Sequence, residues 1–243
     1  MTTETRALLL DADGNLFPSE EPAFVASTEV TNRFLEAHGV QRRYEPEELR
    51  LATTGKNFRT TAVDLLAEAG MADRLSAEAL ERWVAEERRA VSIYLGEVLR
   101  PDPAVLEPLT RLAAGHTLAA VSSSATPRLA ACFAATGLDE LLPPEVRFSA
   151  EDSLPVPTSK PDPAVYLHAL ERLGLDAAQA LAVEDSVPGA QSAVAAGIPT
   201  IGNLCFVQLP ERDERRVALL EAGVATVVTS WDEVEDAVAS PVP

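Results

Sequence analysis

Short runs of apolar residues recur along the chain and are separated by segments with helical periodicity. The runs occupy residues 6–10, 118–121, 180–183 and 225–228, with a shorter one at 200–201. Continuous runs of this kind are typical of strands buried on both faces of a parallel sheet. Helix start and stop signals lie between them, including Gly137 after residues 127–136, and Gly174 after Asp162-Pro163. The alternation predicts an α/β fold with a doubly wound parallel sheet.

Residues 18–96 break this alternation, because they carry helical patterns and no strand pattern. Three apolar stripes with helical spacing run through this part of the chain. They comprise Ala23, Ala26, Val30, Phe34 and Ala37; Ala62, Leu65, Leu66 and Ala69; and Leu80, Trp83, Val84, Val91 and Tyr94. The pattern predicts an all-helical domain at residues 18–96, inserted into a core made of residues 1–17 and 97–243.

Two carboxylates directly follow the first apolar run, in the sequence Asp11-Ala12-Asp13-Gly14-Asn15. Ligands of doubly wound sheets bind at the carboxyl ends of the strands, and side chains two positions apart project to the same side. Two carboxylates this close stay ionised together only beside a cation, which favours a hard divalent metal with oxygen ligands. Taken alone, these residues also fit a polar turn.

Three further motifs lie at expected strand ends or helix starts. Glu184 and Asp185 follow one apolar run, Ser122 and Ser123 end another, and Lys160 precedes a predicted helix. The acidic pair could complete a metal site, while hydroxyls, backbone amides and a lysine could hold a phosphoryl group. Each motif alone also fits a helix cap or a solvated side chain. Their occurrence together in one topology favours phosphoryl transfer.

The four motifs together resemble those of the haloacid dehalogenase superfamily, in particular its phosphatase and β-phosphoglucomutase-like branch. Asp11-Ala12-Asp13-Gly14-Asn15 resembles the first motif, Asp-x-Asp-Gly-Thr/Val, from which Asn15 departs. The remaining motifs are represented by Ser122, by Lys160 in Lys-Pro-Asp-Pro, and by Glu184-Asp185 in Glu-Asp-Ser-x-x-Gly. The resemblance covers nearly the whole chain outside the helical insertion, which resembles the cap of this branch.

The resemblance implies a role for each matching residue. Asp11 is expected to be the nucleophile, and Asp13 the general acid and base. The implied Mg²⁺ site consists of Asp11, Asp13 through its backbone carbonyl, Asp185, and Glu184 directly or through water. The implied phosphoryl-binding side chains are those of Ser122 and Lys160.

The expected reaction is Mg²⁺-dependent hydrolysis of a small phosphomonoester, such as a sugar phosphate or phosphoglycolate, through an aspartyl phosphate. Asp13 argues against dehalogenation, because a halide leaving group needs no proton. Two alternatives remain open: a sugar phosphomutase of the β-phosphoglucomutase type, and a silent binding protein in which Asn15 is the lesion. In the insertion, Lys56 and Arg59 could contact distal groups of a substrate or belong to a solvated turn.

The formal net charge of −18 disfavours nucleic acid as a partner, because such a surface repels phosphates at long range. A phosphate site must therefore be locally positive. No apolar run approaches the roughly 20 residues of a membrane span, and the first residues lack a signal-like pattern. We therefore expect a cytoplasmic protein that acts on a small phosphate ester, with no membrane partner. Residues 202–216 could cover a sheet edge or form a contact.

Overall fold

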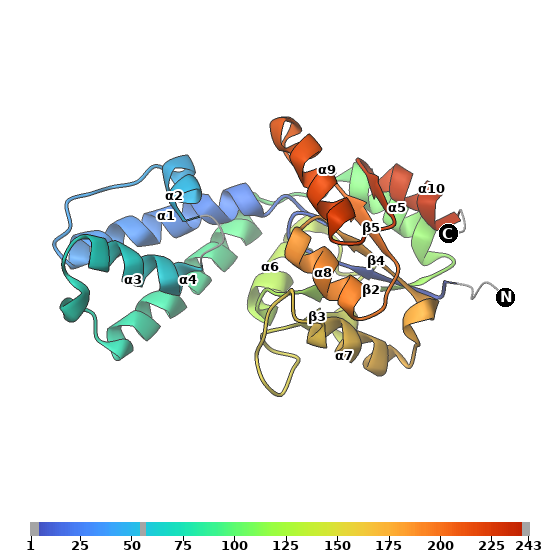
Figure 1. The fold of residues 1–243 in the computed structure, drawn as a ribbon, viewed down its shortest axis with the longest axis horizontal. Coiled ribbons are helices and arrows are strands. Elements are labelled where there is room, and N and C mark those ends of the chain that lie inside the picture. The colour runs from blue at the N-terminus through green and yellow to red at the C-terminus, as the bar shows by residue number, and fades with distance from the viewer. Residues whose placement is uncertain (1–4, 54–56, 240–243) are drawn as a thin grey trace. The chain divides into compact units, whose positions relative to one another are not determined.

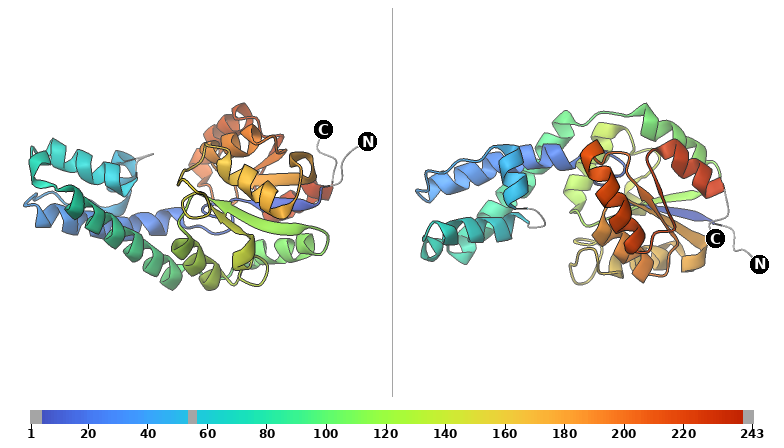
Figure 2. Two further views of the ribbon diagram at one scale, coloured as in Figure 1. Left: turned by 90° about the horizontal axis from the view of Figure 1, so that it is seen from below. Right: turned by 45° about the horizontal axis from the view of Figure 1, so that its top comes forward.

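The computed structural model of the 243-residue chain describes residues 5–53 and 57–239. The chain forms two compact units, one made of Met1–Pro18 and Leu99–Pro243 and the other of Ser19–Val98. The first unit contains the sheet, and the described residues of the second are helical or lie in connecting turns (Figures 1 and 2). We call these units the core and the cap.

The core is built on a six-stranded sheet in the order β3-β2-β1-β4-β5-β6, with every neighbouring pair parallel. The strands are β1 (Ala7–Leu10), β2 (Thr117–Ser122), β3 (Arg147–Ser149), β4 (Ala180–Glu184), β5 (Thr200–Asn203) and β6 (Thr226–Val228). This order confirms the predicted doubly wound α/β fold. Strand β3 was not predicted, because Arg-Phe-Ser has a single apolar residue and no apolar run.

Helices cover both faces of the core sheet. They are α5 (Pro103–Ala113), α6 (Thr126–Thr136), α7 (Ala164–Leu173), α8 (Val187–Ala195), α9 (Arg212–Glu221) and α10 (Trp231–Ala239). Three short 3₁₀ turns are η2 (Pro144–Val146), η3 (Ala177–Gln179) and η4 (Leu209–Glu211). Helices α6 and α7 end at Gly137 and Gly174, as predicted, and both glycines have the positive φ that favours glycine.

The apolar runs of the central strands form the inside of the core. Strands β1 and β4 are buried along their whole lengths. Leu9 and Val121 belong to a buried cluster with Val165 and Tyr166 of α7. Burial of each large apolar side chain contributes about 1.5–3 kcal/mol, so this layer fixes the strands against the helices. The segment after β5 also packs on the core, since Leu204 belongs to a buried cluster with Leu219 and Val227.

The strand order changes direction between β1 and β4, which places a crevice at their carboxyl ends. The chain leaves β1 towards β2 and leaves β4 towards β5, so right-handed crossovers place α5 and α8 on opposite faces. The Asp11 N–H donates to Val183 O at 3.0 Å, which extends the pairing of β1 and β4 beyond β1. Residues that follow these two strands therefore meet at one edge of the sheet.

The cap consists of α1 (Glu20–Ala37), α2 (Pro46–Ala52), α3 (Phe58–Glu68), η1 (Ala72–Arg74) and α4 (Ala77–Val98). Its core surrounds Phe34, whose ring packs edge-on against Trp83 and Phe58 at centroid distances of 5.6 and 6.1 Å. The predicted stripes supply several of its buried residues, among them Val30, Phe34, Ala62, Leu66 and Val84. Across residues 5–53 and 57–239, no helix has the length and apolar character required to cross a membrane.

Candidate active site

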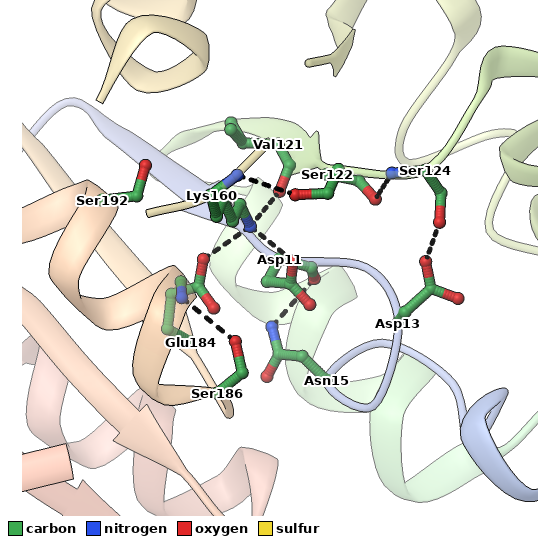
Figure 3. Close-up of polar contacts among 12 residues, drawn as sticks. Asp11, Asp13, Asn15, Val121, Ser122, Ser124, Lys160, Glu184, Ser186 and Ser192 are labelled. Atoms are coloured by element: carbon green, nitrogen blue, oxygen red, sulfur yellow. Dashed lines mark hydrogen bonds and ion pairs between the residues drawn. The ribbon is translucent and has the colours of Figure 1, made fainter. Parts of the chain in front are cut away.

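Lys160 and Asp11 form a buried ion pair at the switch point of the sheet. Lys160 Nζ lies 2.5 Å from Asp11 Oδ1, 2.6 Å from Glu184 Oε1 and 2.8 Å from Val121 O (Figure 3). An ammonium group has three N–H donors, so each of them has an acceptor here. The lysine expected to hold a phosphoryl group thus lies directly beside the expected nucleophile.

Three buried carboxylates meet at this edge and fit a divalent metal. Asp11, Glu184 and Asp185 each offer an oxygen, and these oxygens lie within 4.8 Å of one another. With Lys160 as their cation, three ionised carboxylates leave a net charge of −2, which one divalent ion would neutralise. Glu184 Oε2 is buried and has no hydrogen-bond partner among the described residues. Hard carboxylate oxygens are the ligands that Mg²⁺ prefers.

Two glycines leave room for these carboxylates. A Cβ atom at Gly14 would lie 2.4 Å from Asp185 Oδ2, and one at Gly189 would lie 1.9 Å from Glu184 Oε2. Gly14 also has φ = +79°, which a residue with a side chain rarely adopts. The glycines of the first and fourth motifs are therefore required by the carboxylates that they face.

Burial and like charge make Asp11 difficult to ionise in the absence of a cation. Burial raises the pKa of Asp11 to about 8; Lys160 opposes the shift, and Glu184 adds to it. Burial alone would lower the pKa of Lys160, but Asp11 and Glu184 raise it above its ordinary range. Lys160 is therefore charged at neutral pH, and a bound metal ion would favour the ionised form of Asp11.

Tyr166 belongs to this cluster and was not predicted. Its hydroxyl donates to Glu184 Oε1 at 2.5 Å, and its ring centroid lies 5.1 Å from Lys160 Nζ. Burial, followed by the Glu184 charge, raises the pKa of Tyr166 well above its ordinary value, so the phenol stays protonated. The residue occupies an apolar position of a helical pattern, so the sequence indicates only a core residue there.

The Asp13 carboxylate is held by α6 and the loop before it. Ser124 Oγ donates to Asp13 Oδ2 at 2.7 Å, and Arg128 Nη2 donates to Asp13 Oδ1 at 2.7 Å. Figure 3 shows the carboxylate directed at Ser124, away from the Lys160 ammonium. Arg128 was not among the predicted site residues; the available signal was a basic residue in the first turn of the helix after the serine motif.

The serine loop after β2 is joined to the lysine. Ser122 Oγ accepts a hydrogen bond from Ser124 N at 3.0 Å, and Ser123 Oγ accepts one from Lys160 N at 3.1 Å. Each hydroxyl keeps its proton as a donor for a further acceptor. The loop next to the ammonium group therefore carries hydroxyl donors of the kind that bind phosphoryl oxygens.

A model of the haloacid dehalogenase-like hydrolase family matches residues 5–197. The chain belongs to this family. "Protein CbbY" of Rhodobacter capsulatus is 32% identical over 201 residues, which are 82% of this chain and 85% of that protein. "Phosphorylated carbohydrates phosphatase" of Thermotoga maritima is 29% identical over 222 residues, 91% of this chain and 93% of that protein.

A solved structure with the same fold is that of a putative β-phosphoglucomutase from Thermotoga maritima. It has a TM-score of 0.69 and 26% identity, and the match covers 97% of this chain and 99% of that one. The family match confirms the resemblance inferred from the motifs. The phosphatase among the relatives supports the expected enzyme class, a phosphoric monoester hydrolase.

Asn15 departs from the family's first motif, and the polar atoms of its side chain all have hydrogen-bond partners. The side chain is fully buried, and its Nδ2 donates to Asp11 O at 2.9 Å and to Val183 O at 3.2 Å. The asparagine therefore ties the backbone of the expected nucleophile to β4. This contact disfavours the interpretation of Asn15 as a lesion.

Of the two cap residues predicted to contact a substrate, Arg59 lies among the described residues and Lys56 does not. Arg59, on α3, forms a two-pronged ion pair with Glu81 of α4, with N–O distances of 2.5 and 2.7 Å. Both side chains are exposed, and such pairs typically contribute about 0–1 kcal/mol, so the pair leaves Arg59 able to exchange partners. Lys56 lies outside the described residues. A role of either residue in substrate binding stays a prediction.

Proposed function

We propose that the protein hydrolyses the phosphomonoester of a small phosphorylated carbohydrate through an aspartyl phosphate on Asp11. The observation that carries the proposal is the Lys160–Asp11 pair, in which a cation lies 2.5 Å from a carboxylate at the ligand-binding edge of the sheet. The similarity to a phosphatase of phosphorylated carbohydrates supports the substrate class. Lys160 and a bound divalent ion would together offset the charge of the three carboxylates, so that a phosphate ester could bind despite the net charge of −18 of the chain.

The first step would form a bond between an Asp11 carboxylate oxygen and phosphorus and break the ester bond. Lys160 and the hydroxyl groups of the serine loop would hold the phosphoryl oxygens, because this reaction depends on positioning and charge neutralisation. The leaving oxygen would take a proton from Asp13. For that transfer, the Asp13 carboxylate must exchange Ser124 and Arg128 for the substrate oxygen.

The second step would return Asp11 to its starting state. Asp13 would accept a proton from water as the water oxygen attacks phosphorus, and the bond to Asp11 would break with release of inorganic phosphate. Asp11, Asp185 and Glu184 would hold a Mg²⁺ ion, which when bound would neutralise negative charge on the phosphoryl oxygens. The expected contact of the Asp13 carbonyl with this ion belongs to the same proposal.

The test is a phosphatase assay with p-nitrophenyl phosphate and a panel of phosphorylated carbohydrates, with Mg²⁺ or with EDTA. The proposal predicts release of phosphate with Mg²⁺, little release in EDTA, and a loss of at least 10³-fold in Asp11→Asn. Equal background rates for wild type and Asp11→Asn across the panel would overturn it and favour a silent binding protein.

A second candidate is a sugar phosphomutase, which would transfer the phosphoryl group to a sugar hydroxyl. The similarity to a chain named as a putative β-phosphoglucomutase supports this candidate. A phosphatase and a phosphomutase would use the same core residues, so the reaction products distinguish the two candidates. Conversion of a sugar 1-phosphate into the 6-phosphate without release of phosphate would favour the mutase, whereas stoichiometric phosphate release favours hydrolysis.

A further inference from the structure

A chain of hydrogen bonds through two buried amides leads from the loop after β5 to the expected nucleophile. The Cys205 N–H donates to Asn203 Oδ1 at 3.0 Å, and Asn203 Nδ2 donates to Asn15 Oδ1 at 2.9 Å. Asn15 Nδ2 then donates to Asp11 O and Val183 O, and Figure 3 shows it directed at Asp11. The chain joins residues from β5, β4 and the loop after β1.

A single backbone group fixes the direction of the whole chain. The Cys205 N–H can only donate, so the oxygen of Asn203 faces it and the amide nitrogen faces Asn15. Asn15 must then present its oxygen to Asn203 and its nitrogen to the two backbone carbonyls. A flip of either amide would place two hydrogen-bond donors, or two acceptors, against each other.

The surroundings make this arrangement costly to change. Asn15 and Asn203 are fully buried, and Trp231 Nε1 donates to Asn15 O at 3.1 Å from a buried indole. A buried polar group that loses its partner costs about 1–3 kcal/mol. The low dielectric of the site strengthens each bond, so the amides stay in the one orientation that satisfies them all.

We propose that Asn15 and Asn203 are positioning residues that set the spacing between Asp11 and the carboxylates of Glu184 and Asp185. Asn15 contacts the backbone of Asp11 and of Val183, the residue before Glu184, so one amide holds both halves of the carboxylate cluster. Asn203 acts through Asn15 by fixing its orientation. The proposal rests on the proposed function in taking this cluster as the metal and phosphoryl site.

The test compares Asn203→Leu with a matched variant in the cap. Leucine keeps the approximate size but removes the donor to Asn15. Asn32→Leu is the control, because Asn32 is also buried and its amide makes two hydrogen bonds with the Tyr44 backbone, at 2.9 and 2.8 Å. Mn²⁺ serves as the metal probe, and free Mn²⁺ is measured by electron paramagnetic resonance alongside unfolding by denaturant.

The proposal predicts a Kd for Mn²⁺ at least tenfold higher in Asn203→Leu and an unchanged Kd in Asn32→Leu, as removal of a residue that orients metal ligands typically costs 10- to 100-fold in affinity. It also predicts a lower kcat with little change in KM for Asn203→Leu. Should that variant not fold, Asn203→Ala removes the same donor without adding apolar bulk, and at least a threefold higher Kd is expected.

The proposal would be overturned if a folded Asn203 variant bound Mn²⁺ with the wild-type Kd while its stability fell as in Asn32→Leu. That result would leave the amides a purely structural role. Failure of the proposed function has a different signature. In that case wild type binds Mn²⁺ but hydrolyses no phosphate ester, and the Mn²⁺ constants of the variants still decide the role of the amides.

Discussion

Lys160 Nζ lies 2.5 Å from Asp11 Oδ1, although the two residues are 149 positions apart in the chain. The same ammonium group also contacts Glu184 Oε1 and Val121 O. A phosphoryl group that binds here must therefore take over one of these three hydrogen bonds. The ammonium group that contacts the expected nucleophile is therefore also the one that would meet the phosphoryl group of a substrate.

Replacement of Lys160 by methionine keeps the length of the side chain and removes its charge. We expect kcat for phosphate ester hydrolysis to fall by about 10²- to 10³-fold, since one pre-organised charged contact to the phosphoryl group is lost. Steady-state kinetics with saturating Mg²⁺ would measure the loss. A folded Lys160→Met protein with wild-type kcat would contradict the role given to this residue.

Asp13→Asn should affect substrates according to their leaving groups. A phenolate such as p-nitrophenolate leaves without help from an acid, whereas a sugar alkoxide needs a proton. We expect kcat/KM for a phosphorylated carbohydrate to fall about 10²- to 10⁴-fold and to fall much less for p-nitrophenyl phosphate. Equal losses for both substrates would argue against Asp13 as the acid of the first step.

The pKa of Asp11, raised to about 8 from an ordinary 3.8, predicts a pH dependence of stability without metal. Between these values the folded protein holds a proton that the unfolded chain has lost, so the free energy of unfolding should fall as pH rises. The slope from one such group is at most about 1.4 kcal/mol per pH unit. Denaturant unfolding in EDTA from pH 5 to 8 measures it.

The matched comparison for that slope is Asp11→Asn, which cannot titrate, and Asp73→Asn, which removes an exposed carboxylate of the cap. Asp11→Asn should flatten the decline and be more stable than wild type at pH 8, as expected where a functional site is held at a cost in stability. Asp73→Asn should keep the wild-type slope. A slope unchanged by Asp11→Asn would show that other groups cause it.

Threonine, usual in the family at this motif position, should be unfavourable at position 15 of this chain. Asn15→Thr would leave the buried Asn203 amide without its acceptor, and we expect a loss of about 1–3 kcal/mol in unfolding free energy. The double variant Asn15→Thr with Asn203→Val removes both amides and should regain part of the loss, although the Cys205 N–H then lacks its acceptor. A double variant with fully additive losses would mean that the two residues are not coupled.

The sequence predicts the sheet well, because buried parallel strands appear as apolar runs and the site residues directly follow them. Asp11 and Asp185 follow such strands, Glu184 ends one, and Lys160 precedes a helix, so a doubly wound topology brings them to one edge. Strand β3 is missed because pairing with β2 defines it, rather than its own residues.

Residues that join the site from elsewhere in the fold are less visible in the sequence. Tyr166 has the spacing of a core residue, and only the packing of α7 reveals its contact with Glu184. Asn203 ends β5. Had polar residues at the end of this strand been considered as site candidates, as they were at the other strand ends, Asn203 would have been found. Arg128 meets Asp13 through the orientation of α6, which a pattern of residues does not contain.

The most direct test of the account is to locate the phosphoryl group during turnover. The Asp13→Asn variant, which should hydrolyse the intermediate slowly, is mixed with p-nitrophenyl phosphate and Mg²⁺, quenched in acid and analysed by peptide mass spectrometry. We predict one phosphoryl group on the peptide that contains Asp11, at Asp11 itself, and none in Asp11→Asn. Phosphate release by wild type with the phosphoryl group found on another residue would contradict nucleophilic attack by Asp11.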